Sequence, residues 1–137
     1  MEETLLLIKP DAIQRKLVGK IITRVEEEGF EILDMKMVYL PRKDAEEFYI
    51  QHKGEYFYER LINYMGDNKI IALRLKGKNG ISRLRELIGE TDPKLAKKNT
   101  IRGDYGLGVP QNSVHASDSP QSAKREIDFF FKTPLGI

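Results

Sequence analysis

The sequence predicts one domain of mixed α and β structure, in which short strands alternate with helices. The chain has 137 residues, a length that suits one domain. Apolar residues make up 40% of it and charged residues 32%, an ordinary globular composition. Continuous apolar runs alternate with stretches whose apolar residues recur at helical spacing. The resulting order fits both a small parallel sheet and an antiparallel α+β sandwich, and periodicity alone does not choose between them.

The N-terminal half is predicted to hold two strands and three helices. Thr4 to Ile8 is a short apolar run typical of a buried strand. Lys9-Pro10-Asp11 ends that strand and opens a helix, for which Gly29 is the expected C-terminal cap. Residues 32–40 alternate with a period of two, and the proline that follows stops this strand. Two short helices are then expected, at 44–51 and 56–65.

The C-terminal half is predicted to add two strands, two helices and one long loop. Residues 70–75 form an apolar strand, and a helix follows that ends at Gly89. Residues 90–108 are poor in apolar side chains, and loops this long inside a compact domain are often functional. A short strand is expected at 113–116. The last helix begins near Ser119-Pro120, a hydroxyl cap followed by a proline suited to the first helical position.

Composition and charge argue against several classes of protein. The net charge is +2, which gives no strong case for nucleic acid or a membrane as the main partner. No apolar run approaches the roughly 18 residues that span a bilayer, and the run Leu5 to Ile8 is too short for a signal peptide. The chain has no cysteine, which excludes disulfides and fits a cytoplasmic protein.

His115 is the strongest candidate for a nucleophile. It lies at a predicted strand end just before a capped helix, and a helix start presents unpaired N–H groups that attract anions. A neutral imidazole beside such a site can attack a phosphoryl group. The alternative is an ordinary, partly buried histidine, and the only other histidine, His52, is interpreted in that way because no polar cluster surrounds it in the sequence.

Other residues suit phosphate or ligand binding but have ordinary explanations too. Arg85 and Arg102 flank the long loop, and the planar guanidinium fits phosphate oxygens, although both could be solvated surface groups. Lys9 ends an apolar strand and could either point into a cleft or reach water. Glu126 could orient His115 if the last helix packs beside it. No glycine-rich phosphate loop of the two common types is present, so a nucleotide would have to be bound by cationic side chains and one helix terminus.

Residues 112–118, Asn-Ser-Val-His-Ala-Ser-Asp, resemble the active-site motif N-x-x-H-[GA]-S-D of nucleoside diphosphate kinases. Similar stretches are Ile-Lys-Pro-Asp-Ala at 8–12, Gly-Glu-Thr-Asp-Pro at 89–93 and Thr-Ile-Arg-Gly-Asp at 100–104. The resemblance extends from Thr4 to about Phe131. It implies a ferredoxin-like α+β sandwich with a four-stranded antiparallel sheet covered by helices, and it implies that residues 1–137 form a single nucleoside diphosphate kinase domain.

The resemblance also implies an activity and a set of site residues. A γ-phosphoryl group would move from a nucleoside triphosphate to a diphosphate by a ping-pong mechanism through phosphorylated His115, with Glu126 and Ser117 holding the imidazole. Base recognition by stacking implies broad base tolerance, because every base has a π-face. Mg²⁺ would arrive on the nucleotide phosphates and not in a protein cage. The nucleotide-binding residues implied are Lys9 and Asn112 at the sugar, Arg85, Thr91 and Arg102 at the phosphates, Tyr49 near the transferred group, and Phe57 and Val109 on the two faces of the base.

Some positions depart from the common pattern of the family. Gly54-Glu55-Tyr56 stands where many members have Arg-Pro before the stacking aromatic, and Lys98-Asn99 stands where many eukaryotic members have Pro-Gly. The chain also ends soon after the last helix, as in bacterial or archaeal members. A homo-oligomer is expected, with a hexamer as the first choice and a tetramer as the alternative.

Two rival functions remain to be separated from the kinase. A nucleic-acid-binding module would need a strongly basic face and exposed sheet aromatics, and neither is evident in the sequence. A catalytically silent regulatory domain of the same fold would form no phosphohistidine. The presence of His115, Lys9, Arg102 and Glu126 together argues against this second possibility.

Overall fold

The computed structural model describes residues 1–131 and contains one antiparallel sheet with the strand order β2-β3-β1-β4. Its strands are β1 (Glu2–Ile8), β2 (Glu31–Leu40), β3 (Asn68–Gly77) and β4 (Val114–Ala116). All three strand pairs are antiparallel, so the parallel alternative is excluded and the α+β sandwich is confirmed. The tail at residues 132–137 lies outside the described part of the chain.

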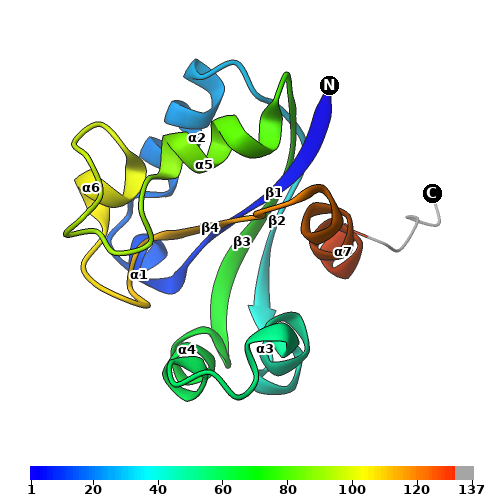
Figure 1. Cartoon of the computed structure of the whole chain (residues 1–137), viewed down its shortest axis with the longest axis vertical. Helices are drawn as coiled ribbons and strands as arrows, with labels where there is room; N and C mark the ends of the chain where they lie inside the picture. The colour runs from blue at the N-terminus through cyan, green and yellow to red at the C-terminus, as the bar shows by residue number, and fades with distance from the viewer. Residues whose placement is uncertain (132–137) are drawn as a thin grey trace.

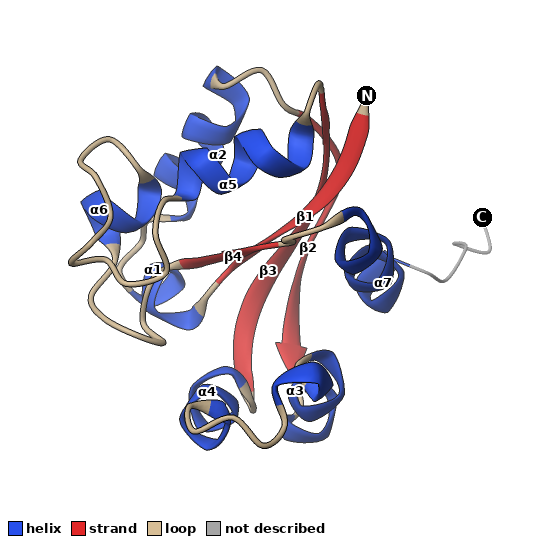
Figure 2. Cartoon of the chain, in the orientation of Figure 1, coloured by secondary structure: helices blue, strands red, loops and turns tan. Residues whose placement is uncertain are grey.

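Helices cover both faces of this sheet (Figures 1 and 2). They are α1 (Pro10–Gln14), α2 (Val18–Glu27), α3 (Arg42–Phe48), α4 (Tyr58–Met65), α5 (Gly80–Ile88), α6 (Ile101–Tyr105) and α7 (Pro120–Phe131), with a short 3-10 turn η1 (Ile50–His52) after α3. Within residues 1–131, no helix is long and apolar enough to cross a membrane.

The alternating side chains of β1 divide the apolar core into two layers. Leu6 and Ile8 pack with α2 and α5 on one face of the sheet. Leu5 and Leu7 pack with α3, α4 and α7 on the other face. All four side chains are fully buried. The continuous apolar run therefore reflects a central strand that is covered on both sides, and the stability of the strand comes from burial in both layers.

The long N-terminal helix expected from the sequence is divided into two. Lys16 adopts a left-handed conformation with φ 61°, which ends α1 and starts a new helix at Val18. The long loop expected at 90–108 contains the short helix α6. In β2 a register shift lies between Ile32 and Asp34, and Met35, which follows it, is exposed.

Candidate functional site

A cavity of about 320 Å³ opens where α3, α4, the long loop and β4 meet, a volume within the range of small-ligand sites. Its walls come from segments far apart in the sequence. All the residues proposed from the sequence line it except Ser117, which lies behind Glu126. The residues lining the cavity are Lys9, Tyr49, Gln51, His52, Tyr56, Phe57, Arg60, Leu61, Arg85, Thr91, Arg102, Val109, Pro110, Asn112, His115, Ala116, Asp118 and Glu126.

His115 is held by a short chain of hydrogen bonds. Strand β4 pairs with β1 and presents the imidazole to the cavity. The Nε2 atom of His115 lies 2.8 Å from Oε1 of Glu126 on α7. The same carboxylate oxygen accepts a hydrogen bond of 2.7 Å from the Ser117 hydroxyl. Glu126 and Ser117 are almost fully buried, whereas His115 keeps 20% of its side chain exposed.

The charge of Glu126 decides which nitrogen of His115 carries the proton and which has a free lone pair. Burial alone would raise the pKa of this carboxyl, but hydrogen bonds and charge from His115, with a further bond from Ser117, lower its pKa. The group is therefore an ionised carboxylate at neutral pH and can only accept hydrogen bonds. The proton between the two side chains must then be carried by Nε2, which leaves a lone pair on Nδ1 of a neutral imidazole.

Acid should destabilise the fold through Glu126. Because its pKa is lower in the folded protein than the usual 4.5, it stabilises the fold above about pH 4.5, and this contribution is lost as pH falls through the folded pKa. Replacing Glu126 by Gln should lower the free energy of unfolding at pH 7 by ~1–3 kcal/mol and flatten its pH dependence below pH 5. Urea unfolding across that range measures both effects. Glu59→Gln, at an exposed ion pair with Arg42, is the matched control and should change little. An unchanged acid slope in the Glu126 variant would contradict the prediction.

Two of the three guanidinium groups that line the cavity, those of Arg85 and Arg102, are held by backbone carbonyl oxygens. Arg102 is buried and donates hydrogen bonds to the carbonyl oxygens of Gly89 (3.1 Å) and Val114 (2.9 Å). Arg85 on α5 donates to the Ala116 carbonyl oxygen at 3.2 Å. Burial and the nearby Arg85 lower the pKa of Arg102 to about 10, so Arg102 remains a cation at neutral pH. Among residues 1–131, both groups are bonded to backbone carbonyl oxygens and not to carboxylates, which leaves their charge available to an anion.

Helix α6 places Arg102 through a tight local structure. Thr100 caps the helix, its hydroxyl accepting from the backbone N–H of Gly103 at 3.1 Å. A side chain at Gly103 would collide with the carbonyl oxygen of Lys97, so only glycine allows this approach. An ion pair of 2.8 Å between Arg24 on α2 and Asp104 fastens the helix to the body of the protein.

Lys9 is a buried amine in the wall of the cavity. Its Nζ donates to Oδ1 of Asn112 at 2.7 Å and to the carbonyl oxygen of Pro110 at 3.3 Å. Asn112 in turn donates to the Thr91 carbonyl oxygen at 2.8 Å. Burial, followed by the charge of Arg102, lowers the pKa of Lys9 to about 7. The lysine thus belongs to the cavity wall and does not reach into water.

Aromatic rings line part of the cavity. Phe57, just before α4, lies with its ring 5.4 Å from that of His52. Tyr49 is buried, and among the described residues its hydroxyl has no hydrogen-bond partner. Val109 is 42% exposed and lines the cavity. A flat ligand group could therefore stack on an aromatic ring here, and the Tyr49 hydroxyl could hydrogen-bond a polar ligand group.

At this site the structure adds to one expectation from the sequence and overturns another. His52, interpreted as a surface or packing residue, packs against Phe57, and the turn η1 also places it on the cavity wall. The start of α7 was expected to line the anion site, yet the residue of that helix that does so is Glu126, two turns further along. Ser119 instead caps α7 by accepting from the N–H of Ser122 at 3.0 Å.

Several cavity residues gave no signal in the sequence. Gln51, Tyr56, Arg60 and Leu61 reach the cavity because the chain reverses between α3 and α4. Asp118 could have been proposed, since it follows the histidine within the same motif. The others could not, because their participation depends on how two helices meet.

A family model described as Nucleoside diphosphate kinase matches residues 2–134 of the chain. The chain belongs to the nucleoside diphosphate kinase family. It is 53% identical over 131 residues to the nucleoside diphosphate kinase of Methanocaldococcus jannaschii, an alignment that covers 96% of this chain and 94% of that protein. It is 52% identical to the Methanococcus maripaludis enzyme, over 96% of this chain and 98% of the relative. A crystal structure of the Aquifex aeolicus nucleoside diphosphate kinase superposes with a TM-score of 0.92 at 41% identity, covering 95% of this chain and 94% of that one.

Membership of the nucleoside diphosphate kinase family confirms the resemblance seen in the sequence motifs. The protein is accordingly an enzyme, a kinase that binds nucleoside di- and triphosphates and transfers phosphoryl groups between them. The cavity is lined by His115, by arginine guanidinium groups and by aromatic rings, which are chemical groups that such an activity requires.

Proposed function

We propose that the enzyme transfers the γ-phosphoryl group by a ping-pong mechanism in which Nδ1 of His115 is phosphorylated. The observation that carries this proposal is the hydrogen-bonded chain from Ser117 through Glu126 to Nε2 of His115, at the wall of a cationic cavity. That chain keeps the proton on Nε2 and leaves the lone pair of Nδ1 free to attack. It is the arrangement expected of an oriented, activated nucleophile.

The first half-reaction forms one bond and breaks one. The Nδ1 lone pair attacks the γ-phosphorus in line and forms an N–P bond, while the bond from phosphorus to the β–γ bridging oxygen breaks. The nucleoside diphosphate leaves with that electron pair. Glu126 stabilises the positive charge that develops on the imidazole. In the second half-reaction a terminal oxygen of another diphosphate attacks the phosphohistidine, and the imidazole leaves as the neutral ring.

The cations of the cavity are proposed to bind the phosphates. Arg85 and Arg102 would contact the phosphate oxygens together with the Thr91 hydroxyl, and phosphoryl transfer depends mainly on such positioning and charge stabilisation. The Nε atom of Arg102 and the Tyr49 hydroxyl are both buried without a partner among the described residues. These two orphan donors support a polar ligand at this place, since buried donors are normally satisfied.

Lys9 and Asn112 are proposed to hydrogen-bond the sugar hydroxyls, and Lys9 also to reach the phosphate. Phe57 and Val109 would contact the two faces of the base. Because stacking does not read the hydrogen-bonding edge of a base, we expect broad base tolerance.

The donor set fits Mg²⁺ bound through the nucleotide. Within residues 1–131 no group of three or more metal-ligating side chains lies together, and Glu126 is engaged with His115 and Ser117. Asp118 is an exposed carboxylate at the cavity wall, the kind of oxygen that magnesium takes alongside water and phosphate. The ion would neutralise charge on the phosphates when bound.

Incubation with γ-labelled ATP and Mg²⁺ tests the proposed function. We expect an acid-labile, alkali-stable label on the protein that GDP and CDP both remove. A label that only ADP removes would contradict broad base tolerance. A wild-type protein that takes no label would overturn the mechanism and favour a catalytically silent domain.

Nucleotide binding should be coupled to proton uptake by Lys9. The pKa of this amine is about 7 in the structure, and contact with polyphosphate should raise it towards its ordinary value of 10.5. Near pH 8.5, binding of Mg-ADP should therefore take up close to one proton, and at about pH 6 almost none. Calorimetric titration in two buffers of different ionisation enthalpy measures this uptake. Lys9→Met should remove it and Lys124→Met, at an exposed position, should retain it. Equal uptake in wild type and Lys9→Met would refute the coupling.

We further propose that residues 1–137 form one domain of this family, that the protein is cytoplasmic, and that it forms a homo-oligomer. A hexamer is the first choice and a tetramer the alternative. Sedimentation equilibrium distinguishes the two assemblies. Nucleic acid is not proposed as the main ligand, because the charge is nearly balanced; tight binding with a steep salt dependence would contradict this.

A further inference from the structure

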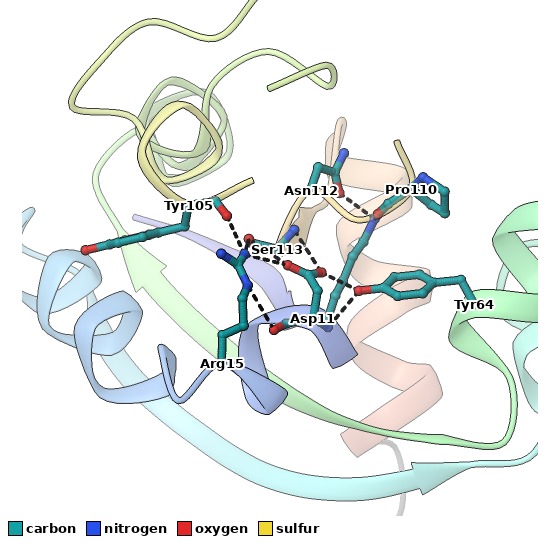
Figure 3. Close-up of polar contacts among 8 residues, drawn as sticks. Asp11, Arg15, Tyr64, Tyr105, Pro110, Asn112 and Ser113 are labelled. Atoms are coloured by element: carbon teal, nitrogen blue, oxygen red, sulfur yellow. Dashed lines mark hydrogen bonds and ion pairs between the residues drawn. The ribbon is translucent and has the colours of Figure 1, made fainter. Parts of the chain in front are cut away.

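A buried carboxylate that does not line the cavity connects three segments beside it. Asp11, at the start of α1, accepts hydrogen bonds from the Ser113 backbone N–H (3.2 Å), the Ser113 hydroxyl (2.9 Å) and the Arg15 guanidinium (3.1 Å). It also accepts from the Tyr64 hydroxyl, which itself accepts from the Asp11 backbone N–H at 2.7 Å. Figure 3 shows these groups converging on Asp11 from α1, α4 and the segment before β4. Only 5% of Asp11 is exposed.

The principal partner of Asp11 is held in an uncommon conformation. Ser113 has φ 76°, in the left-handed region that costs a residue with a side chain roughly 1–2 kcal/mol. Such a conformation persists only where the surroundings fix it. Both hydrogen-bond donors of Ser113 are used on Asp11, and its carbonyl oxygen accepts from the backbone N–H of Lys9 at 2.9 Å. The carboxylate therefore maintains this turn.

The residues next to this turn are the ones proposed to contact the sugar. Asn112 precedes Ser113 directly, and Lys9 lies two residues before Asp11. The 2.7 Å bond from Lys9 Nζ to Asn112 Oδ1 forms only if the two segments keep their register. Three hydrogen bonds between the segments fix that register: the Ser113 N–H and hydroxyl donate to Asp11, and the Lys9 N–H donates to the Ser113 carbonyl oxygen.

We propose that Asp11 is a positioning residue for the sugar end of the nucleotide site. It acts through Ser113 on Asn112 and Lys9 and does not itself touch the substrate. Tyr64 and Arg15 hold the carboxylate in place by donating hydrogen bonds to it. Arg15 also donates to the Tyr105 carbonyl oxygen, and this bond anchors Arg15 to α6. This inference rests on the proposed function of Lys9 and Asn112.

The test compares phosphohistidine formation from ATP and from 2′,3′-dideoxy-ATP, with rates normalised to the folded fraction. The wild type should prefer ATP, because the dideoxy sugar offers no hydroxyl to Lys9 and Asn112. In Asp11→Asn the rate with ATP should fall by about tenfold, an effect of the size of one charge-assisted hydrogen bond. The rate with the dideoxy donor should fall much less, so the preference for ATP should shrink.

Two further variants keep the proposal falsifiable. Ser113→Ala removes only the hydroxyl from the turn and should reduce the preference for ATP over the dideoxy donor by a smaller factor. If Asp11→Asn does not fold, this variant tests the proposal in its place. Asp34→Asn changes a carboxylate in a surface ion pair with Arg74 and should leave the preference unchanged. If both rates fall by the same factor in the folded variants, Asp11 is merely structural and the inference is overturned. If the wild type takes no label from ATP, both this inference and the proposed function are overturned. If the wild type is labelled but the variants keep its preference for ATP over the dideoxy donor, the inference alone is overturned.

Discussion

Replacing His115 by alanine is expected to reduce phosphoryl exchange between nucleotides by at least about 10⁴-fold, because the variant has no atom to carry the phosphoryl group between the two half-reactions. The fold should persist. The ring is partly exposed, and it loses the 2.8 Å hydrogen bond to Glu126 and edge interactions with Phe48 and Tyr49 at centroid distances of 5.5 and 6.0 Å. Glu126 keeps the hydrogen bond from the Ser117 hydroxyl. The rate of GDP phosphorylation by ATP and the label retained on the protein measure the effect, with circular dichroism as the check on folding.

His52→Ala is the control for this experiment, since it removes the only other histidine, whose ring lies 5.4 Å from Phe57. It should still take an acid-labile label from ATP. A label that persists in the His115 variant and disappears in the His52 variant would reverse the assignment of the nucleophile.

Replacing Arg102 by alanine is expected to damage both stability and activity. The carbonyl oxygens of Gly89 and Val114 would lose their donors inside the protein, which should lower the free energy of unfolding by ~2–4 kcal/mol. The phosphates would lose a fixed cation, which should lower kcat/KM by about 10²–10³-fold. Urea unfolding measures the first effect and steady-state kinetics the second. Arg102→Lys should recover only part of either, because an ammonium cannot reproduce the planar fork.

Arg74→Ala provides the contrast for Arg102. Arg74 also makes two close contacts, with Asp34 (2.6 Å) and Glu3 (2.8 Å), but these lie at the surface of the sheet. Its loss should cost at most ~1 kcal/mol and leave kcat/KM unchanged. If the two variants were equally stable and equally active, the proposed role of Arg102 in the cavity would be wrong.

The elements of the fold were largely predictable, because burial imposes periodicity on the sequence. The apolar run at 4–8 marked the central strand, and Ser119-Pro120 marked the start of α7. Strand direction was not predictable from periodicity, since β1 is buried on both faces and its pattern is that of a parallel strand as well. The break at Lys16 was missed because a left-handed lysine has no sequence signal of its own.

The site was predictable where the chain resembles the family, both within the local motif and at positions outside it such as Phe57 and Glu126. His115, Ser117 and Asn112 lie within one stretch of seven residues, so a resemblance could find them. His52 and Arg60 enter the cavity through the meeting of α3 and α4, a tertiary event that leaves no pattern in the sequence. The importance of Asp11 was hidden for the same reason, because its partners lie 53 and 102 positions away.

The contact between Lys9 and Asn112 joins positions separated by 103 residues. A nascent chain that stops before residue 112 lacks Asn112 and cannot form this contact. A chain that stops before residue 126 lacks the Glu126 carboxylate that orients the His115 imidazole. Turnover should therefore appear late during synthesis on the ribosome and all at once, without graded activity in shorter fragments. A phosphoryl-transfer assay on nascent chains would in this way report completion of the whole tertiary structure.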